Sequence, residues 1–217
     1  MHVPLSQKGD TTFWYKYHNE LAHRLSLTAL PKSTHRYHFR IWMDRQAIEI
    51  WQESNGDSKG HLISWAKENT PEKEEPTNRI AHRAVSLDSS AIRKLNQLIK
   101  KSNINSLPDQ EKIAGWKQGF DGIEYIIESL DKENYYLKTY WTPTAQGDLE
   151  EAKAIVSFVQ DASKLVSSQE EWKSFTATIS YECYMNSSMT TVCKILSSAG
   201  KRRLKREREK YRKSQIK

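Results

Sequence analysis

Three carboxylates between residues 119 and 143 are the side chains best suited to acid–base chemistry. Asp121, Glu124 and Glu128 lie in GFDGIEYIIESLDKENYYLKTYWTP, and many hydrolases use two carboxylates as acid and base. The alternation predicts a strand that separates Glu124 from Glu128 by roughly 13 Å, whereas a glycosidase pair needs roughly 5–9.5 Å. The pattern therefore favours a turn at Asp121 and structural glutamates. A hydrolase that combines Asp121 or Glu128 with a histidine is an alternative.

The sequence lacks the other common catalytic and metal-binding patterns. It contains no G-x-S-x-G, no glycine-rich phosphate loop and no H-E-x-x-H. His35 and His38 would point to opposite faces of a strand, so we expect no metal site from them. Cys183 and Cys193 have no histidine nearby, which argues against zinc. The sequence favours a protein that is not an enzyme and uses no cofactor.

The cysteines and the N-terminus bear on the compartment. A bond between Cys183 and Cys193 would suit an oxidising compartment, while two reduced thiols would suit the cytoplasm equally well. The first 20 residues lack the basic-then-apolar pattern of a signal peptide. The sequence as given therefore predicts a cytoplasmic protein, or a periplasmic one if a leader precedes it. No apolar run reaches the roughly 18 residues of a transmembrane helix.

Positive charge is concentrated at the C-terminus. The whole chain has a net charge of +7, and residues 201–217 hold ten Lys or Arg and two Glu, so the remainder is close to neutral. This segment predicts a solvated arm, a contact to nucleic acid or anionic lipid, or docking onto an acidic protein surface. The expected contact residues are Lys201, Arg202, Arg203, Lys205, Arg206 and Arg208.

Aromatic residues mark a second candidate surface. In YHFRIWMD the residues from Tyr37 to Met43 alternate, with Phe39 on one face of the expected strand and Trp42 on the other. One face should form the core, and the other is either covered by a helix or used for recognition. If it is used for recognition, the expected protein-binding residues are Trp42, Trp51 and Trp65.

Periodicity predicts the elements that carry these residues. Strands are expected in a hairpin at 37–53, at 61–68, at 79–87, and at about 123–130 and 134–141. Helices are expected at about 13–29 with an apolar stripe, at 88–103 with Asp88 as N-cap, and after Asp148, which has capping-box spacing to Glu151.

These elements predict an α+β fold, an antiparallel sheet with helices packed on one face, plus a C-terminal basic helical or disordered arm. We divide the chain into an N-terminal helical segment (1–34), an α+β core domain (35–168), a helical or irregular extension (169–200) and a basic tail (201–217).

One motif points to a resemblance. The chain has the pattern Asp-Gly-x-x-aromatic-Ile-x-Glu, then a tyrosine strand that ends in aromatic-x-Pro, at Asp121, Gly122, Tyr125, Ile126, Glu128, Tyr136, Trp141 and Pro143. Over about residues 37–165 it resembles a loose family of small bacterial proteins without an established activity. The linker 54–79 lacks the glycine-rich character of that family, and the chain after about 170 has no counterpart in it. The resemblance implies an α+β fold, a bacterial origin and an accessory or immunity-type binder.

We therefore expect a non-enzymatic bacterial protein-binding factor of the immunity or antitoxin type. A nucleic-acid- or membrane-associated factor tethered by the basic tail is the first alternative. A hydrolase with a carboxylate and a histidine outside the known motifs is the second.

Overall fold

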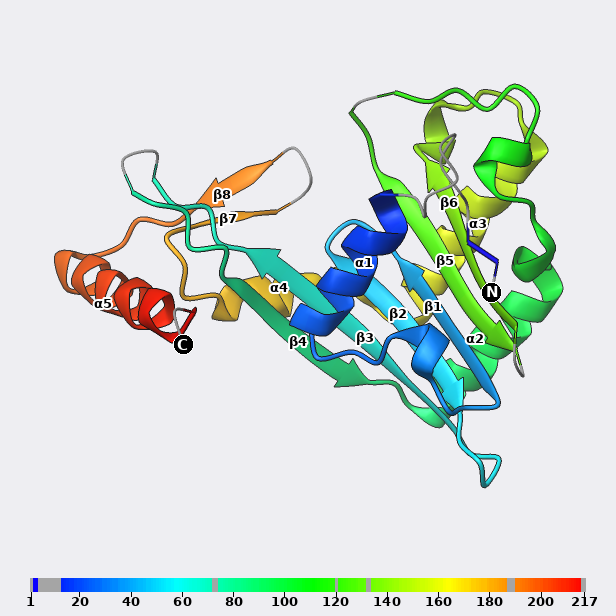
Figure 1. Ribbon diagram of the computed structural model, residues 1–217, viewed down its shortest axis with the longest axis horizontal. Coiled ribbons are helices and arrows are strands. Elements are labelled where there is room, and N and C mark those ends of the chain that lie inside the picture. Colours follow the sequence, from blue (N-terminus) through cyan, green and yellow to red (C-terminus); the bar gives the residue numbers. More distant parts are fainter. Residues whose placement is uncertain are drawn as a thin grey trace.

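The centre of the structure is an antiparallel sheet of six strands in the order β4-β3-β2-β1-β5-β6 (Figure 1). The structure is a computed structural model that describes residues 2–3, 13–71, 74–119, 121–131, 134–186 and 190–215. The strands are β1 (Tyr37–Trp42), β2 (Gln46–Gln52), β3 (Ser58–Lys67), β4 (Ile80–Ser86), β5 (Glu124–Asp131) and β6 (Asn134–Trp141). The predicted α+β class and the six strands are confirmed.

Two helices, α2 (Ser89–Ser102) and α3 (Glu150–Leu165), pack on one face of the sheet. Asp88 caps α2 as predicted, because its side chain accepts a hydrogen bond from the backbone N–H of Ala91 at 2.8 Å. The capping box predicted at Asp148 is wrong. The N-cap of α3 is Leu149 and has no side-chain cap.

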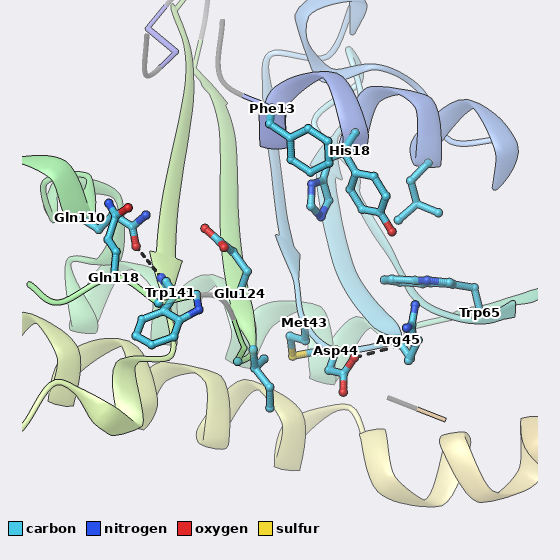
Figure 2. Close-up of a pocket in the computed structure, with 15 residues that line it drawn as sticks. Phe13, His18, Met43, Asp44, Arg45, Trp65, Gln110, Gln118, Glu124 and Trp141 are labelled. Atoms are coloured by element: carbon cyan, nitrogen blue, oxygen red, sulfur yellow. Dashed lines mark hydrogen bonds and ion pairs between the residues drawn. The ribbon is translucent and has the colours of Figure 1, made fainter. Parts of the chain in front are cut away.

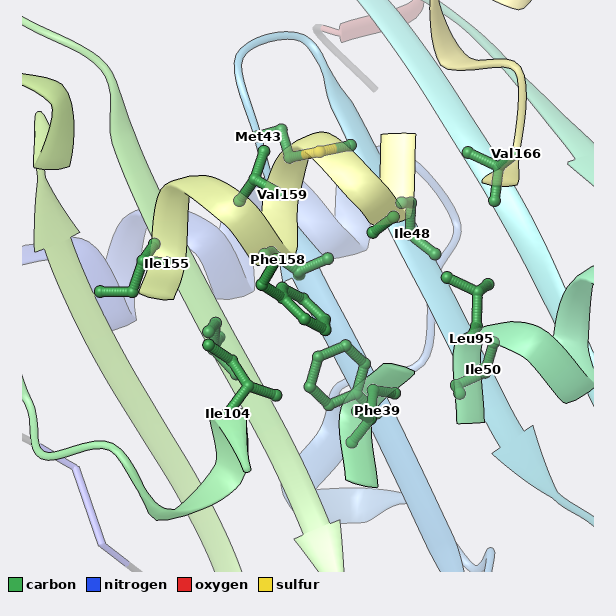
Figure 3. Close-up of a cluster of buried hydrophobic side chains, with 14 of the residues drawn as sticks. Phe39, Met43, Ile48, Ile50, Leu95, Ile104, Ile155, Phe158, Val159 and Val166 are labelled. Atoms are coloured by element: carbon green, nitrogen blue, oxygen red, sulfur yellow. The ribbon is translucent and has the colours of Figure 1, made fainter. Parts of the chain in front are cut away.

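The main core lies between these helices and the sheet (Figure 3). Phe39 of β1 and Phe158 of α3 meet edge to face, with ring centroids 6.0 Å apart. Ile48 and Ile50 of β2 and Leu95 of α2 are each at most 2 % exposed. The alternation of β1 therefore directs its apolar residues into this core, as the sequence predicts.

A third helix, α1 (Phe13–Arg24), covers part of the opposite face, so the expectation of helices on one face describes only α2 and α3 (Figure 1). Leu21 of α1 and Leu25, the residue after the helix, pack in one cluster with Trp42 and Trp65, whose rings meet edge to face with centroids 5.6 Å apart. The first turns of α1 differ, because Phe13 is 69 % exposed although it belongs to the predicted apolar stripe.

The C-terminal part forms a third cluster at one end of the molecule (Figure 1). It contains α4 (Ser168–Thr178), the two-stranded sheet of β7 (Cys183–Met185) and β8 (Thr191–Cys193), and α5 (Ser198–Gln215). Phe175, Tyr184 and Leu204 pack there around Ala66 of β3. The predicted extension and basic tail therefore form one packed unit.

Short 3₁₀ turns complete the fold at Leu30–Lys32, Ile104–Ser106, Gln110–Lys112 and Pro143–Ala145. In the part of the chain that the structure describes, no helix is long and apolar enough to cross a membrane.

Candidate functional site

A pocket of about 390 Å³ opens where α1 passes the β1–β2 turn and the adjoining ends of β5 and β6 (Figure 2). We call it the aromatic pocket. Its walls include Phe13, Tyr17, Trp65, Ile123, Glu124 and Trp141. It also receives Asp44 and Arg45 from the β1–β2 turn, whose charged groups lie 3.8 Å apart. The pocket therefore combines aromatic surface with several charged groups.

The rim of the aromatic pocket is apolar and exposed. Among the described side chains, the exposed large hydrophobic residues are Phe13 (69 %), Tyr17 (40 %), Ile123 (38 %) and Ile195 (104 %). The first three all line this pocket, and Ile195 does not. Scattered exposed apolar residues are ordinary, but their gathering at one opening is typical of a binding surface.

One side of the pocket is held by close backbone packing. A Cβ atom on Gly119 would lie 2.5 Å from the indole ring of Trp141, so only glycine lets the loop lie against that ring. The buried side chain of Gln146 fixes the same loop. It accepts a hydrogen bond from the Lys117 N–H at 2.8 Å and donates to the carbonyl oxygens of Lys117 and Trp141 at 2.9 and 3.0 Å. The position of Trp141 is therefore set before any ligand arrives.

Glu124 contributes an unusual carboxyl group to the aromatic pocket. Its Oε1 atom is buried and accepts no hydrogen bond from any described residue. Burial, and then the nearby carboxylate of Asp109, raise the pKa of Glu124 to about 8. Glu124 is therefore mostly protonated at neutral pH. Burial and the negative charge of Asp109 favour this neutral form.

Glu128, in contrast, has both oxygens occupied inside the sheet. Its Oε1 accepts from the hydroxyl of Tyr135 at 2.7 Å. Its Oε2 accepts from Trp42 Nε1 at 2.6 Å and from Arg40 Nη1 at 3.4 Å. Glu128 is 3 % exposed, whereas Asp121 is exposed in the turn before β5. The geometry gives Glu128 a structural role and does not bring it together with Asp121.

A second chain of polar groups has the connectivity of a catalytic triad. Ser33 Oγ lies 2.9 Å from His38 Nδ1, and His38 Nε2 lies 2.5 Å from Glu49 Oε1. The same Glu49 oxygen accepts from Arg40 Nη2 at 2.6 Å. Burial acts to raise the pKa of Glu49, but His38 and then Arg40 lower it below its usual value. Ser33 does not line the cavity of about 150 Å³ beside His38. We therefore interpret this chain as a support for the loop that enters β1.

That small cavity also brings His35 and His61 near His38 and Trp51. Burial, and then the neighbouring His38, lower the pKa of His35. Within the described ranges, however, no three His, Cys, Asp or Glu side chains are grouped so that they could hold a metal ion.

Two of the three tryptophans expected at a protein interface are buried. Trp42 is 1 % and Trp65 is 4 % exposed, because α1 covers them, so neither can act as a surface anchor in this fold. Trp65 does reach one wall of the aromatic pocket. Trp51 is half-buried, stacks on His35 and donates to Glu53 Oε1 at 2.9 Å. The amphipathic pattern of α1 was the signal for this covering.

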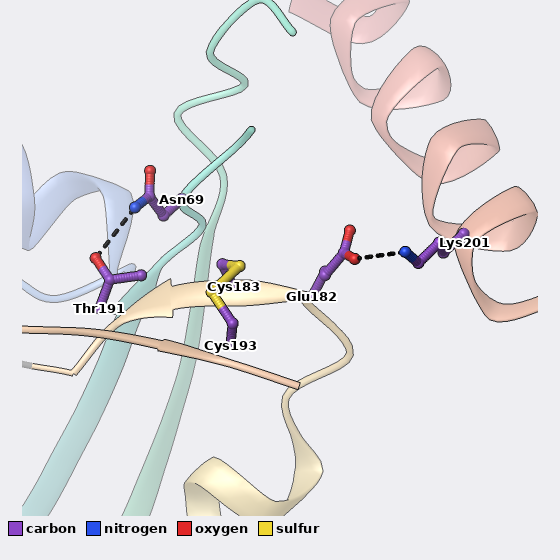
Figure 4. The surroundings of a disulfide bond; sticks show 6 residues. All are labelled: Asn69, Glu182, Cys183, Thr191, Cys193 and Lys201. Atoms are coloured by element: carbon purple, nitrogen blue, oxygen red, sulfur yellow. Dashed lines mark hydrogen bonds and ion pairs between the residues drawn. A yellow bond between two sulfur atoms is a disulfide. The ribbon is translucent and has the colours of Figure 1, made fainter. Parts of the chain in front are cut away.

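The predicted basic contacts divide into structural and outward-facing groups. Arg208 is only 3 % exposed and donates to Glu68 Oε1 and Glu74 Oε2, both at 2.8 Å, so its assignment to anion binding is wrong. Lys201 lies 3.4 Å from Glu182 at the other end of the helix (Figure 4). The exposed basic residues of α5 are Lys201, Arg202, Arg203, Lys205, Arg206, Lys210 and Lys213.

Comparison of the chain with protein-family models and with curated proteins finds no match in either case. Among the described residues, the aromatic pocket and the outer side of α5 offer surfaces from which a function can be argued. Sequence reasoning named Glu124 and the α5 cations but missed Phe13 and Ile123, because no local pattern shows that two distant apolar residues share one opening.

Proposed function

We propose that this chain is a non-enzymatic bacterial binding protein of the immunity or antitoxin type, and that it docks a partner protein at the aromatic pocket. The observation that supports this proposal most directly is that Phe13, Tyr17 and Ile123 expose apolar surface around one opening. Burying such side chains contributes roughly 1.5–3 kcal/mol each, which is the scale of interface hot spots. The resemblance of residues 37–165 to small bacterial proteins agrees with this proposal.

A protein fits this opening better than a small molecule does. A small ligand is usually enclosed on most sides, whereas here three of the lining side chains, Phe13, Tyr17 and Ile123, are between 38 % and 69 % exposed. A partner that inserts one side chain into the cavity would also cover the rim. This combination of a central anchor and a surrounding apolar ring is common in protein interfaces.

The test compares capture of partners from a bacterial lysate by three forms of the full chain. The double variant Phe13→Ser/Ile123→Ser removes rim surface, and Ile195→Ser removes an exposed apolar side chain elsewhere. A partner captured by the wild type should be lost with the double variant and retained by Ile195→Ser. The partner is then purified, and its affinity for the double variant should fall by roughly 2–4 kcal/mol. Unchanged affinity would remove the aromatic pocket from the proposal.

The outer side of α5 supports a second candidate, a factor that associates with nucleic acid or anionic lipid. Leu204 and Arg208 attach one side of the helix to the body, so the other side presents a fixed row of cations that includes Arg202, Arg206 and Lys213. A rigid row of cations binds phosphates with strong salt dependence.

Substitution tests this candidate better than deletion of residues 201–217, because deletion would also remove Arg208 from the buried Glu68. Arg202→Glu/Arg206→Glu should weaken binding to DNA, RNA or anionic vesicles and reduce its salt dependence. The matched control is Lys94→Glu/Lys101→Glu, two charge reversals on α2. Equal effects of the two variants would remove α5 from this role.

We propose that the protein works in an oxidising compartment, which for a bacterium is the periplasm; the alternative is the cytoplasm, which the sequence as given favours. Cys183 and Cys193 face each other across β7 and β8 and form a disulfide (Figure 4). Such bonds persist mainly outside reducing compartments. Intact cells are alkylated before lysis, and the mass of the purified protein is then measured. We expect Cys183 and Cys193 to carry no alkyl group, because the disulfide protects both sulfurs. Two alkylated thiols would favour the cytoplasm.

A further inference from the structure

Glu124 contributes to the aromatic pocket a carboxyl oxygen that receives no hydrogen bond from the described residues. Figure 2 shows it between Trp141 on one side and Phe13 and His18 on the other. Its Oε1 atom is buried and accepts no hydrogen bond from a described residue. A buried carboxyl oxygen without a donor reduces stability, and Glu124 lines an open cavity, so a ligand that enters beside it can supply the missing donor.

The surroundings of Glu124 favour a positively charged ligand. The carboxylate of Asp109 acts on Glu124 and is itself buried, where it accepts from the Thr139 N–H at 2.7 Å. Arg45 Nε lies 3.8 Å from Asp44 Oδ1, so the charges of these two side chains largely cancel. The titratable and charged groups that face the cavity or act on Glu124 are Tyr17, His18, Asp44, Arg45 and Asp109. Their carboxylates outnumber their guanidinium groups, so an added cation would meet net negative charge.

The walls favour a flat cation over a compact one. Trp141, Phe13 and Tyr17 contribute aromatic surface to the pocket that Glu124 lines. A guanidinium group can stack its flat face on such rings while its N–H groups bind a carboxylate in a fork. An ammonium group can lie over a ring as a point charge, but it has no flat face and no fork.

We propose that the aromatic pocket receives the guanidinium group of an arginine side chain presented by the partner protein, with Glu124 as the paired carboxylate. This proposal rests on the docking of a protein at the same pocket. Glu124 would lose its proton when the guanidinium group enters, because a positive charge at hydrogen-bonding distance favours the ionised form.

The release of the Glu124 proton on binding makes the affinity for the guanidinium group depend on pH. With a pKa of about 8 for Glu124 before binding, each complex formed below that pH releases nearly one proton. Affinity should therefore rise with pH and level off above about pH 8. From about pH 6 to about pH 8 the expected gain is about 50-fold, since the ionised fraction of Glu124 rises by that factor.

The test uses three small probes on the full chain, n-butylguanidinium, n-butylammonium and the neutral n-butylurea. Binding is followed by the indole N–H signals of Trp65 and Trp141 in NMR spectra. We expect the guanidinium to bind about tenfold tighter than the urea, in line with one charge-assisted contact. Equal binding of the two would overturn the proposal, and tighter or equal binding of the ammonium would overturn the assignment to arginine.

Glu124→Gln should abolish both the preference for guanidinium and the rise with pH. Glu150→Gln, at an exposed position on α3, should change neither. If Glu124→Gln does not fold, Glu124→Asp keeps a carboxyl group and should keep the pH dependence with weaker binding. A preference that persists in Glu124→Gln would contradict the role of this residue.

The probes also separate this inference from the docking proposal. If the rim variants lose the partner but guanidinium shows no preference, docking stands and the arginine assignment falls. If guanidinium binds through Glu124 but the rim variants keep the partner, the pocket is a cation site and protein docking there falls.

Discussion

Replacing Arg208 by alanine tests how α5 is held on the body. Arg208 is 3 % exposed, and Glu68, one of its two carboxylate partners, has a fully buried side chain. Glu74, the other, has a side chain that is 38 % exposed. Leu204 is the apolar residue of α5 that is buried beside it. The variant would therefore remove the main polar attachment of the helix.

The expected loss of stability depends on how well the buried carboxylate of Glu68 is still paired once Arg208 is removed. Removing one member of a buried ion pair typically costs about 3–5 kcal/mol, because the remaining charge stays buried. Thr77 still donates to Glu68 Oε2 at 2.6 Å, and Arg79 lies 3.6 Å away, so both would lessen the penalty. We therefore expect the lower end of that range, about 3 kcal/mol.

Hydrogen exchange of the α5 amides measures this loss directly. A loss of about 3 kcal/mol corresponds to about 150-fold faster exchange if α5 opens separately from the sheet. Arg206→Ala is the matched control, since it removes the same side chain from the exposed side of the same helix. Its effect should stay within about 0.5 kcal/mol.

Two results would refute this reasoning. Equal exchange in Arg208→Ala and Arg206→Ala would mean that the ion pairs contribute nothing to the attachment. A double variant Arg208→Ala/Glu68→Gln that is no more stable than Arg208→Ala would mean that an unpaired buried charge is not the cause of the loss.

Three further variants probe the sheet and the pocket, and a fourth, in α5, serves as a control. Glu124→Gln should flatten the pH dependence of stability: the pKa of Glu124 rises from 4.5 to about 8 on folding, so the native state binds the extra proton and loses stability as pH rises between these values. Urea unfolding at about pH 5 and about pH 8 checks it, and parallel losses in both proteins would contradict it. Gly119→Ala should destabilise by about 1–3 kcal/mol and alter near-UV circular dichroism, because its Cβ would overlap Trp141. Gly200→Ala in α5, where the nearest atoms lie at 3.5 Å, should instead be neutral or slightly stabilising. Trp42→Phe should cost about 2–4 kcal/mol in thermal unfolding by removing the donor to Glu128, and a loss below about 1 kcal/mol would show that this bond matters little.

Local patterns predicted the elements of this fold because the relevant physics is local. Alternation identified β1 and its hairpin partner β2, and Asp88 marked the start of α2. The covering of Trp42 was left open, because whether α1 folds back over the sheet depends on contacts between distant segments. The attachment of α5 was equally hidden, since Arg208 meets Glu68 across 140 positions of sequence.

The pairing of charges inside the sheet shows the same limit. Arg40 stands directly opposite Glu49 on β2 and Glu128 on β5, so the register places a cation between two carboxylates. Each strand alone shows only an ordinary polar residue on the face opposite the core. The interpretation of Glu128 as structural was reached from its spacing to Glu124, whereas the actual reason is its place in this cross-strand set.

These buried charges explain why Glu124 stands apart. Glu49, Glu128 and Glu68 are each buried and each meets an arginine and at least one further donor. By this pattern, a fourth buried carboxyl group would also be expected to have an arginine and a further donor as partners. Glu124 instead faces an open cavity with a buried oxygen that no described residue satisfies. A carboxyl group that departs from the pattern of the other three is a candidate functional position, which is the reason for testing Glu124 with a cation.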